Sequence, residues 1–154
     1  MYILLLSFSL LMGFVPTENP KLIIKIENIE VLEGDIRIGV FNTSESFLKQ
    51  GFTFKKYKIA VKNTTETIII DDLPKGEYAF LLYHDKNADG EMNRNLLGIP
   101  KEPFAFSNNV EPKLSKPTFE ECKFSFEGNL VLLVRLGFFN YKMNCFKRIY
   151  LAYK

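Results

Sequence analysis

The residues most suited to chemistry in this sequence lie in the polar segment 84–95. Three Asp or Asn residues spaced by two are followed by a glycine, which matches the D-x-[DN]-x-[DN]-G start of a calcium-binding loop. Ca²⁺ takes about 6–8 oxygen ligands, and side chains at alternate positions of a curled loop converge on its inner side. The sequence therefore predicts a Ca²⁺ site of modest affinity, with the ligands Asp85, Asn87, Asp89, Glu91 (through its carbonyl) and Asn93.

The same segment also has an interpretation without metal. Its twelfth position is Leu96, where a helix–loop–helix calcium site has a bidentate Glu, and an apolar strand pattern precedes it. Asn and Asp side chains in a solvated turn also bond backbone N–H groups without any ion. Glu102 adds a carboxylate only if the chain folds back onto the loop. We favour the ion over the metal-free turn.

An enzyme site is the competing hypothesis for this segment. His84, Asp85 and Glu102 would surround a metal-bound water in a metal-assisted hydrolase. His84 is the chain's only histidine, and adjacent strand residues point to opposite faces, so it cannot pair simply with Asp85 as base and orienting acid. We therefore expect no catalytic residue, and a binding or structural module whose ordered loop meets an envelope protein or a glycan.

The runs that must position this loop have a period of two, which is typical of strands. Residues 77–84 are apolar on both sides, so this strand is expected to be central. Residues 118–126 and 130–136 are expected to form a closing pair, and residues 85–117 to form one long polar loop. Together with the earlier runs 21–28, 36–40, 54–62 and 67–70, these strands predict an all-β fold, an antiparallel β-sandwich of about seven strands.

Composition limits the class of protein. The chain has 154 residues, of which 47% are hydrophobic and 25% charged, as expected for one folded domain. The net charge of +2 argues against a nucleic-acid partner. Two cysteines exclude a disulfide-rich scaffold and a four-thiolate zinc site. A bridge between Cys122 and Cys145 remains open, and two free thiols are favoured, with Cys122 on a strand facing the core.

The two ends of the chain differ in composition from the domain between them, and the N-terminal one suggests export. Residues 3–15 carry no charge and are too short to span a bilayer, so residues 1–17 are expected to be a signal peptide, with a buried first element as the alternative. The domain would then be 18–136, in an extracytoplasmic location that is periplasmic, cell-surface or secreted. Residues 137–154 form a basic aromatic extension with four basic residues and no acidic one. Membrane association through this extension is an alternative to an edge strand or an extension without a role.

Four segments in this order resemble a known family: L-P-K-G-E-Y-A at 73–79, H-D-K-N-A-D-G at 84–90, L-G-I-P-K-E at 97–102 and F-S-N-N at 106–109. They are similar to the bacterial domain of unknown function 2141 over about residues 22–135. The resemblance implies a small exported β-sandwich, like the prealbumin and carboxypeptidase-regulatory modules, with no established enzyme activity. The loop also resembles the calcium loops of adhesin B-type repeats, which implies the same ion ligands as above.

Overall fold

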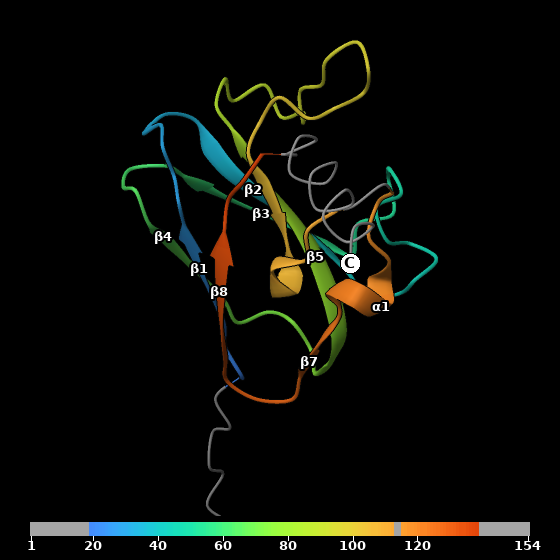
Figure 1. Cartoon of the computed structure of the whole chain (residues 1–154). Helices are drawn as coiled ribbons and strands as arrows, with labels where there is room; N and C mark the ends of the chain where they lie inside the picture. Colours follow the sequence, from blue (N-terminus) through green and yellow to red (C-terminus); the bar gives the residue numbers. More distant parts are fainter. Residues whose placement is uncertain (1–18, 113–114, 139–154) are drawn as a thin grey trace, which may run out of the picture.

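The computed structural model describes residues 19–112 and 115–138. Figure 1 shows these residues as two β-sheets packed against each other, which confirms the predicted all-β sandwich. The predicted signal peptide, Cys145 and all but the first two residues of the C-terminal extension lie outside the described residues. Within the described part, no helix is both long enough and apolar enough to cross a membrane.

The described residues form eight strands in two sheets. The first sheet has three strands in the order β4 (Glu66–Ile70), β1 (Leu22–Glu27) and β8 (Leu130–Arg135). The second sheet has five strands, with β3 (Lys55–Ala60), β2 (Asp35–Phe41), β5 (Gly76–Asp85) and β6 (Phe104–Phe106) in that order, and β7 (Phe124–Phe126) paired with β5. The sandwich is not wholly antiparallel, because the first and last strands, β1 and β8, pair in parallel.

The main core lies between the two sheets. Successive side chains of a strand point to opposite faces, so every second residue enters this core. On β1 the buried residues are Leu22, Ile24 and Ile26, and the other strands repeat the pattern. The main core therefore follows the period of two read from the sequence.

The strand β5 is central, as predicted, and its outer face carries a second apolar cluster. It pairs with β2, β6 and β7, and its residues Ala79, Leu81 and Tyr83 face away from the main core. Phe47, from the loop that follows β2, packs in this outer cluster against the rings of Phe41, Phe106 and Phe119. The remaining members are Ala79, Phe104, Cys122 and the partly buried Leu48, Leu81, Tyr83, Met92 and Val110. Apolar residues on both faces of β5 thus belong to two different clusters.

The prediction of one strand over residues 118–126 is wrong. A helical turn, α1 (Phe119–Cys122), comes first, and a reciprocal capping box between Thr118 and Glu121 starts it. Cys122 therefore packs in the outer cluster, whereas the strand parity predicted that it would share a face with Phe124 and Phe126. The predicted pairing with residues 130–136 is also absent, because β7 pairs with β5 and β8 pairs with β1.

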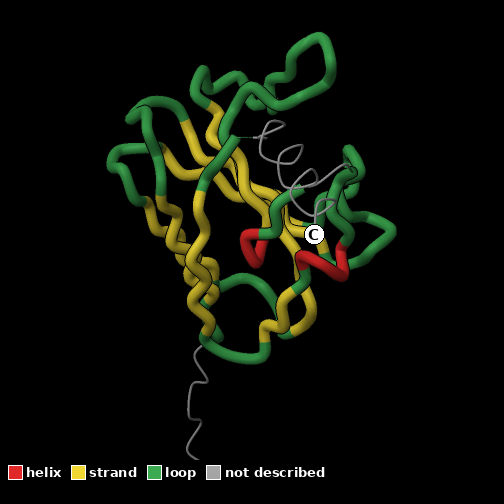
Figure 2. Tube along the Cα trace, in the orientation of Figure 1, coloured by secondary structure: helices red, strands yellow, loops and turns green. Residues whose placement is uncertain are grey.

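The long loop predicted at 85–117 is divided by the short strand β6, followed by the helical turn η1 (Ser107–Asn109). Three residues are too few to give a period, although all three side chains of β6 are buried. Phe104 also pairs with Gly137, the first residue of the predicted extension. What remains between β5 and β6 is residues 86–103, which we call the strand-end loop, drawn with the other loops in Figure 2.

Candidate functional site

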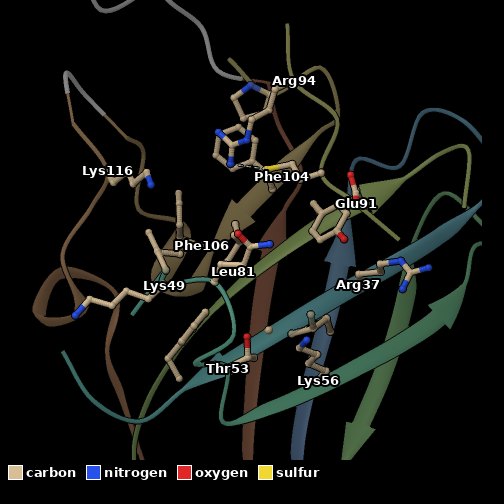
Figure 3. A pocket seen from close by; sticks show the side chains of 18 of the residues that line it. Arg37, Lys49, Thr53, Lys56, Leu81, Glu91, Arg94, Phe104, Phe106 and Lys116 are labelled. Carbon is tan, nitrogen blue, oxygen red and sulfur yellow. Dashed lines mark hydrogen bonds between the residues drawn. The ribbon is translucent and has the colours of Figure 1, made fainter. Parts of the chain in front are cut away.

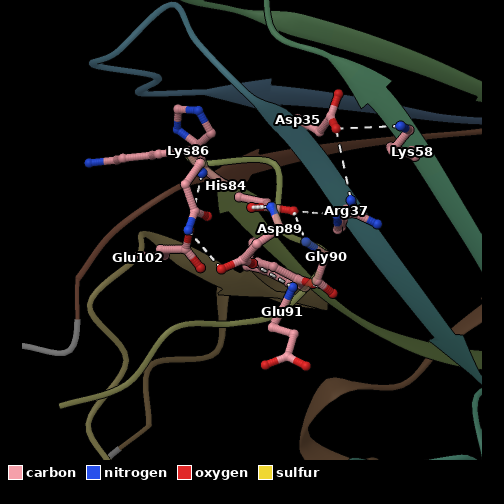
Figure 4. A network of polar contacts seen from close by, with 12 residues as sticks. Asp35, Arg37, Lys58, His84, Lys86, Asp89, Gly90, Glu91 and Glu102 are labelled. Atoms are coloured by element: carbon pink, nitrogen blue, oxygen red, sulfur yellow. Dashed lines mark hydrogen bonds and ion pairs between the residues drawn. The ribbon is translucent and has the colours of Figure 1, made fainter.

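Asp85 ends β5 and holds the first half of the strand-end loop. Its side chain is fully buried, and its Oδ1 accepts a hydrogen bond from the backbone N–H of Asp89 at 3.1 Å. Its Oδ2 accepts from the backbone N–H of Gly90 at 2.9 Å and from Nε of Arg37 at 2.5 Å (Figure 4). The carboxylate therefore curls the loop, and a guanidinium from β2 balances its charge.

Glu102 holds the second half of the same loop. Only 5% of it is exposed, and its Oε1 accepts from the backbone N–H of Lys86 while Oε2 accepts from that of Asn93, both at 3.0 Å. The chain thus folds back onto the loop, which was the condition for Glu102 to join it. Figure 4 shows Glu102 beside Lys86, at the start of the loop. Its two oxygens join the start, middle and end of the loop.

Two features of the backbone bring these carboxylates together. The antiparallel pairing of β5 with β6 places Tyr83 opposite Phe104, so the ends of the strand-end loop are neighbours. The turn before β2 packs against the start of the loop at Gly34, which has a φ of +72°. A Cβ atom on Gly34 would lie 2.1 Å from the carbonyl oxygen of Asp85, so only glycine fits this contact.

The remaining predicted ion ligands gather around Asp89. Its Oδ2 accepts from the side-chain amides of Asn87 at 2.7 Å and Asn93 at 2.8 Å, and its Oδ1 accepts from the backbone N–H of Glu91 at 2.9 Å. These bonds, that of Asn93 above all, lower the pKa of Asp89. The carbonyl of Glu91 lies 3.5 Å from the amide of Asn93. The structure thus brings four of the five predicted ligands together, whereas Asp85 is engaged with Arg37.

These residues make at most a weak cation site. Asp89 supplies one carboxylate, because that of Asp85 is paired with Arg37. The two amides and the carbonyl of Glu91 bring the total to four oxygens, fewer than the six to eight that Ca²⁺ takes. Among the described residues, no group of three or more His, Cys, Asp or Glu is placed to hold a metal ion. An ion at Asp89 would therefore keep several waters.

The residues of the hydrolase hypothesis are not assembled around a common point. His84 faces the main core, is fully buried, and its Nε2 lies 2.7 Å from the carbonyl oxygen of Glu33. Its Nδ1 has no hydrogen-bond partner among the described residues. Asp85 lies on the opposite face of β5, as strand parity predicts, and the oxygens of Asp85 and Glu102 accept backbone N–H groups.

A groove of about 930 Å³ lies on the outer face of the five-stranded sheet, and the strand-end loop forms one of its walls (Figure 3). Its floor is apolar and includes Leu81 and Tyr83 from β5 and Phe104 and Phe106 from β6. Met92 enters from the strand-end loop. Sequence reasoning missed this groove, because its lining comes from six separate parts of the chain.

The rim of the groove is strongly basic. Its lining includes one acidic residue, Glu91, and six basic ones, Arg37, Lys49, Lys56, Lys58, Arg94 and Lys116. Arg37 and Lys58 are paired with acidic residues of the sheet. The other four form no ion pair within the described residues, and Figure 3 shows Lys49, Lys56, Arg94 and Lys116 around the groove. A net charge of only +2 conceals this local excess, because acidic residues elsewhere balance it.

Several motif residues outside the loop have structural roles. Ser107 accepts a hydrogen bond from the buried backbone N–H of Phe80 at 3.0 Å. Asn109 bonds both the carbonyl of Leu133 and the N–H of Arg135, and so covers the free edge of β8. These contacts account for Ser and Asn in F-S-N-N through packing of the fold, without any chemistry at a site.

A family model described as "Uncharacterized protein conserved in bacteria (DUF2141)" matches residues 24–131. The match covers more than half of the 154 residues, so the chain belongs to this family, and the resemblance drawn from its four segments is confirmed. No curated protein and no solved structure matches the chain. The likeness to prealbumin and to carboxypeptidase-regulatory modules therefore stays a prediction.

Proposed function

We propose that this member of the DUF2141 family is a non-catalytic, exported binding module whose ligand site is the groove beside the strand-end loop. The observation that carries the proposal is that two buried carboxylates, Asp85 and Glu102, fix this loop as a wall of the groove. Each carboxylate accepts hydrogen bonds from two backbone N–H groups of the strand-end loop. A wall fixed in this way lowers the entropy cost of ordering the site when a ligand binds.

The burial of the ionisable groups supports a binding role over catalysis. A general acid, a general base or a metal-bound water has to reach the substrate, within hydrogen-bond distance or through one water. His84 and Asp85 are fully buried and Glu102 nearly so, and the carboxylates are committed to the backbone of the loop. The carboxylates of Asp85 and Glu102 thus hold the loop that forms the wall of the groove, and they are not available to a substrate.

The groove can be tested with a neutral apolar dye, N-phenyl-1-naphthylamine, whose fluorescence rises in apolar sites. We expect the full chain to bind it saturably. Glu102→Gln should weaken this binding, because an amide cannot accept both N–H groups, whereas the exposed control Glu111→Gln should not. Dye binding that is absent in the parent protein, or unchanged in Glu102→Gln while hydrogen exchange in the loop rises, would contradict the proposal.

The export part of the proposal rests on the uncharged segment 3–15. Mass spectrometry of the protein made in a bacterial host tests it. We expect a product that lacks about the first 17 residues and is recovered outside the cytoplasm. An intact N-terminus on protein in the cytoplasm would contradict export. An intact N-terminus on protein in the membrane fraction would instead support the membrane-associated alternative.

Calcium is a second candidate ligand. The convergence of the Asn87 and Asn93 side chains on Asp89 supports it, with the Glu91 carbonyl beside the amide of Asn93. We expect a dissociation constant of about 10⁻⁴–10⁻³ M, the range of extracellular modules. Asp89→Asn should remove the response of the amide signals of residues 87–93 to Ca²⁺, and the exposed control Asp71→Asn should retain it. A variant of Asp85 cannot serve here, because it also breaks the contact with Arg37. No saturable change in these amide signals at millimolar Ca²⁺ would overturn this proposal.

A further inference from the structure

We propose that the ligand of the groove is a free single-chain amphiphile with an anionic head, such as a long-chain carboxylate. This inference rests on the proposed function, since it names the class of ligand for the same site. It combines three properties of the groove: an apolar floor, a rim with four cations that form no ion pair within the described residues, and a volume suited to one small molecule.

The floor provides apolar surface that the described residues leave partly exposed. Leu81, Tyr83 and Met92 are only partly buried, and they pack against the buried rings of Phe104 and Phe106. An alkyl chain placed on this surface removes apolar area from water, which stabilises the complex by about 25 cal/mol for each Å² buried. A purely polar anion would leave the floor exposed.

The floor is kept open by a glycine in the middle of β2. A Cβ atom on Gly39 would lie 3.3 Å from Cγ2 of Thr53 and 3.7 Å from Cε2 of Phe41. Because Gly39 also lines the groove, a larger side chain at this position would press on Thr53 and Phe41 or extend into the space where we place the alkyl chain. The glycine is not required by its backbone conformation, since its φ is not positive. The closeness of Thr53 and Phe41, which leaves little room for a side chain, accounts for the glycine better.

The rim selects the charge of the head group. The lining holds only one carboxylate, that of Glu91, beside the four cations Lys49, Lys56, Arg94 and Lys116. None of these four cations forms an ion pair within the described residues. In Arg94, Nη1 donates to the carbonyl of Gly98, a neutral group, so its charge remains uncompensated. An anionic head is attracted to such a rim and a cationic head is repelled, and both effects weaken as salt screens exposed charges.

The size of the groove favours an individual molecule. Its volume of about 930 Å³ lies within the range of about 300–1,000 Å³ that small-molecule sites occupy. Loop residues also bound it on several sides, namely 48–53, 90–100, 112 and 115–117. A bilayer surface is nearly flat and would reach the rim without filling this space.

The test displaces N-phenyl-1-naphthylamine from the full chain with decanoate and with decyltrimethylammonium, each below its critical micelle concentration. The two have similar tails and heads of opposite charge. We expect decanoate to displace the dye at a concentration at least tenfold lower, and to lose this advantage in 1 M salt. Equal displacement by the two amphiphiles would overturn the inference, yet it would leave the groove as the binding site.

A matched pair of double variants tests whether the charge preference comes from the rim or from the net charge of the protein. The double change Lys56→Glu with Lys116→Glu should weaken decanoate binding about tenfold or more, a larger factor than for the neutral dye. The control, Lys62→Glu with Lys75→Glu, makes the same change in net charge outside the groove and should alter decanoate binding less than twofold. If the control weakens it equally, net charge and not the rim is responsible, and the inference is wrong.

Two further arms separate the remaining explanations. Gly39→Val should remove binding of both dye and decanoate; if it melts like the parent yet binds both, the groove is not the site. Should Gly39→Val fail to fold, the charge variants decide the question.

Binding to phosphatidylglycerol vesicles without binding of free decanoate would show recognition of a membrane surface and overturn the inference. Absence of dye binding in the parent chain would overturn the proposed function as well.

Discussion

Nε of Arg37 on β2 lies 2.5 Å from Oδ2 of Asp85, the last residue of β5. Asp85 is fully buried, whereas 28% of the Arg37 side chain is exposed, so the cation covers the carboxylate from the solvent side. The same carboxylate accepts two backbone N–H groups of the strand-end loop. One ion pair therefore fixes the position of the loop relative to the sheet and to the groove.

Removing Arg37 should destabilise the fold. Arg37→Ala leaves the buried carboxylate of Asp85 without a counter-charge. We expect the free energy of unfolding to fall by about 2–3 kcal/mol. This loss is smaller than that for a fully buried pair, because Arg37 is partly exposed. Arg135→Ala, which removes an exposed pair with Glu27, is the control and should cost less than about 1 kcal/mol. Urea denaturation measures both, and equal effects would show that the Arg37 contact is not special.

Replacing Gly34 should be more damaging than replacing an unconstrained glycine. In Gly34→Ala the new methyl group meets the carbonyl oxygen of Asp85 at 2.1 Å, and the positive φ adds strain, so we expect a loss of about 3 kcal/mol or more. Gly128→Ala is the control, because its Cβ would meet nothing within 4 Å. Thermal melting of the two variants tests this, and similar melting temperatures would contradict the close contact.

Stability should fall in acid through two carboxylates with depressed pKa values. Lys55 and Tyr57 lower the pKa of Asp72 by hydrogen bonds, and Asn93 lowers that of Asp89. A carboxyl whose folded pKa is below its unfolded value stabilises the fold above the unfolded pKa, and this contribution is lost as pH falls through the folded pKa. Urea midpoints measured between about pH 5 and pH 2 should therefore decline less in Asp72→Asn than in the parent. An identical decline would exclude a contribution from Asp72.

Cys122 should be unreactive in the folded protein. Burial raises the pKa of its thiol to about 12, so almost no thiolate is present near neutral pH. In a Cys145→Ser variant, Ellman's reagent at pH 8 should label Cys122 only after urea is added. Rapid labelling without urea would place the thiol at the surface and contradict its position in the outer cluster.

The strands that flank the main core were predictable because their sequence period reflects burial on one face. Residues 77–84 were correctly recognised as central from their apolar residues on both sides. The prediction of a strand over 118–126 was wrong because Thr118 and Glu121 form a helix cap. The alternating apolar residues in this segment drew attention away from that capping pattern. The pairing of β1 with β8 joins residues 108 apart, and no local pattern in the chain specifies such a contact.

The candidate site was predictable only in part. The motif located the loop and its polar residues, but a sequence pattern cannot distinguish a carboxylate that binds an ion from one that bonds backbone N–H groups. Arg37 carried a weak signal, since it lies between Ile36 and Ile38 and so had to face outward from the core. The groove gave no signal, because its cations come from distant parts of the chain and meet only after folding.

The central claim is that the groove beside the strand-end loop binds ligand, and amide chemical-shift mapping with N-phenyl-1-naphthylamine tests it most directly. The account predicts saturable shifts at the lining glycines Gly39, Gly90 and Gly98. The exposed apolar row on the outer face of the three-stranded sheet, which includes Ile69 and Val131, is the competing surface. Shifts confined to that row, or no saturable shift at all, would contradict the account.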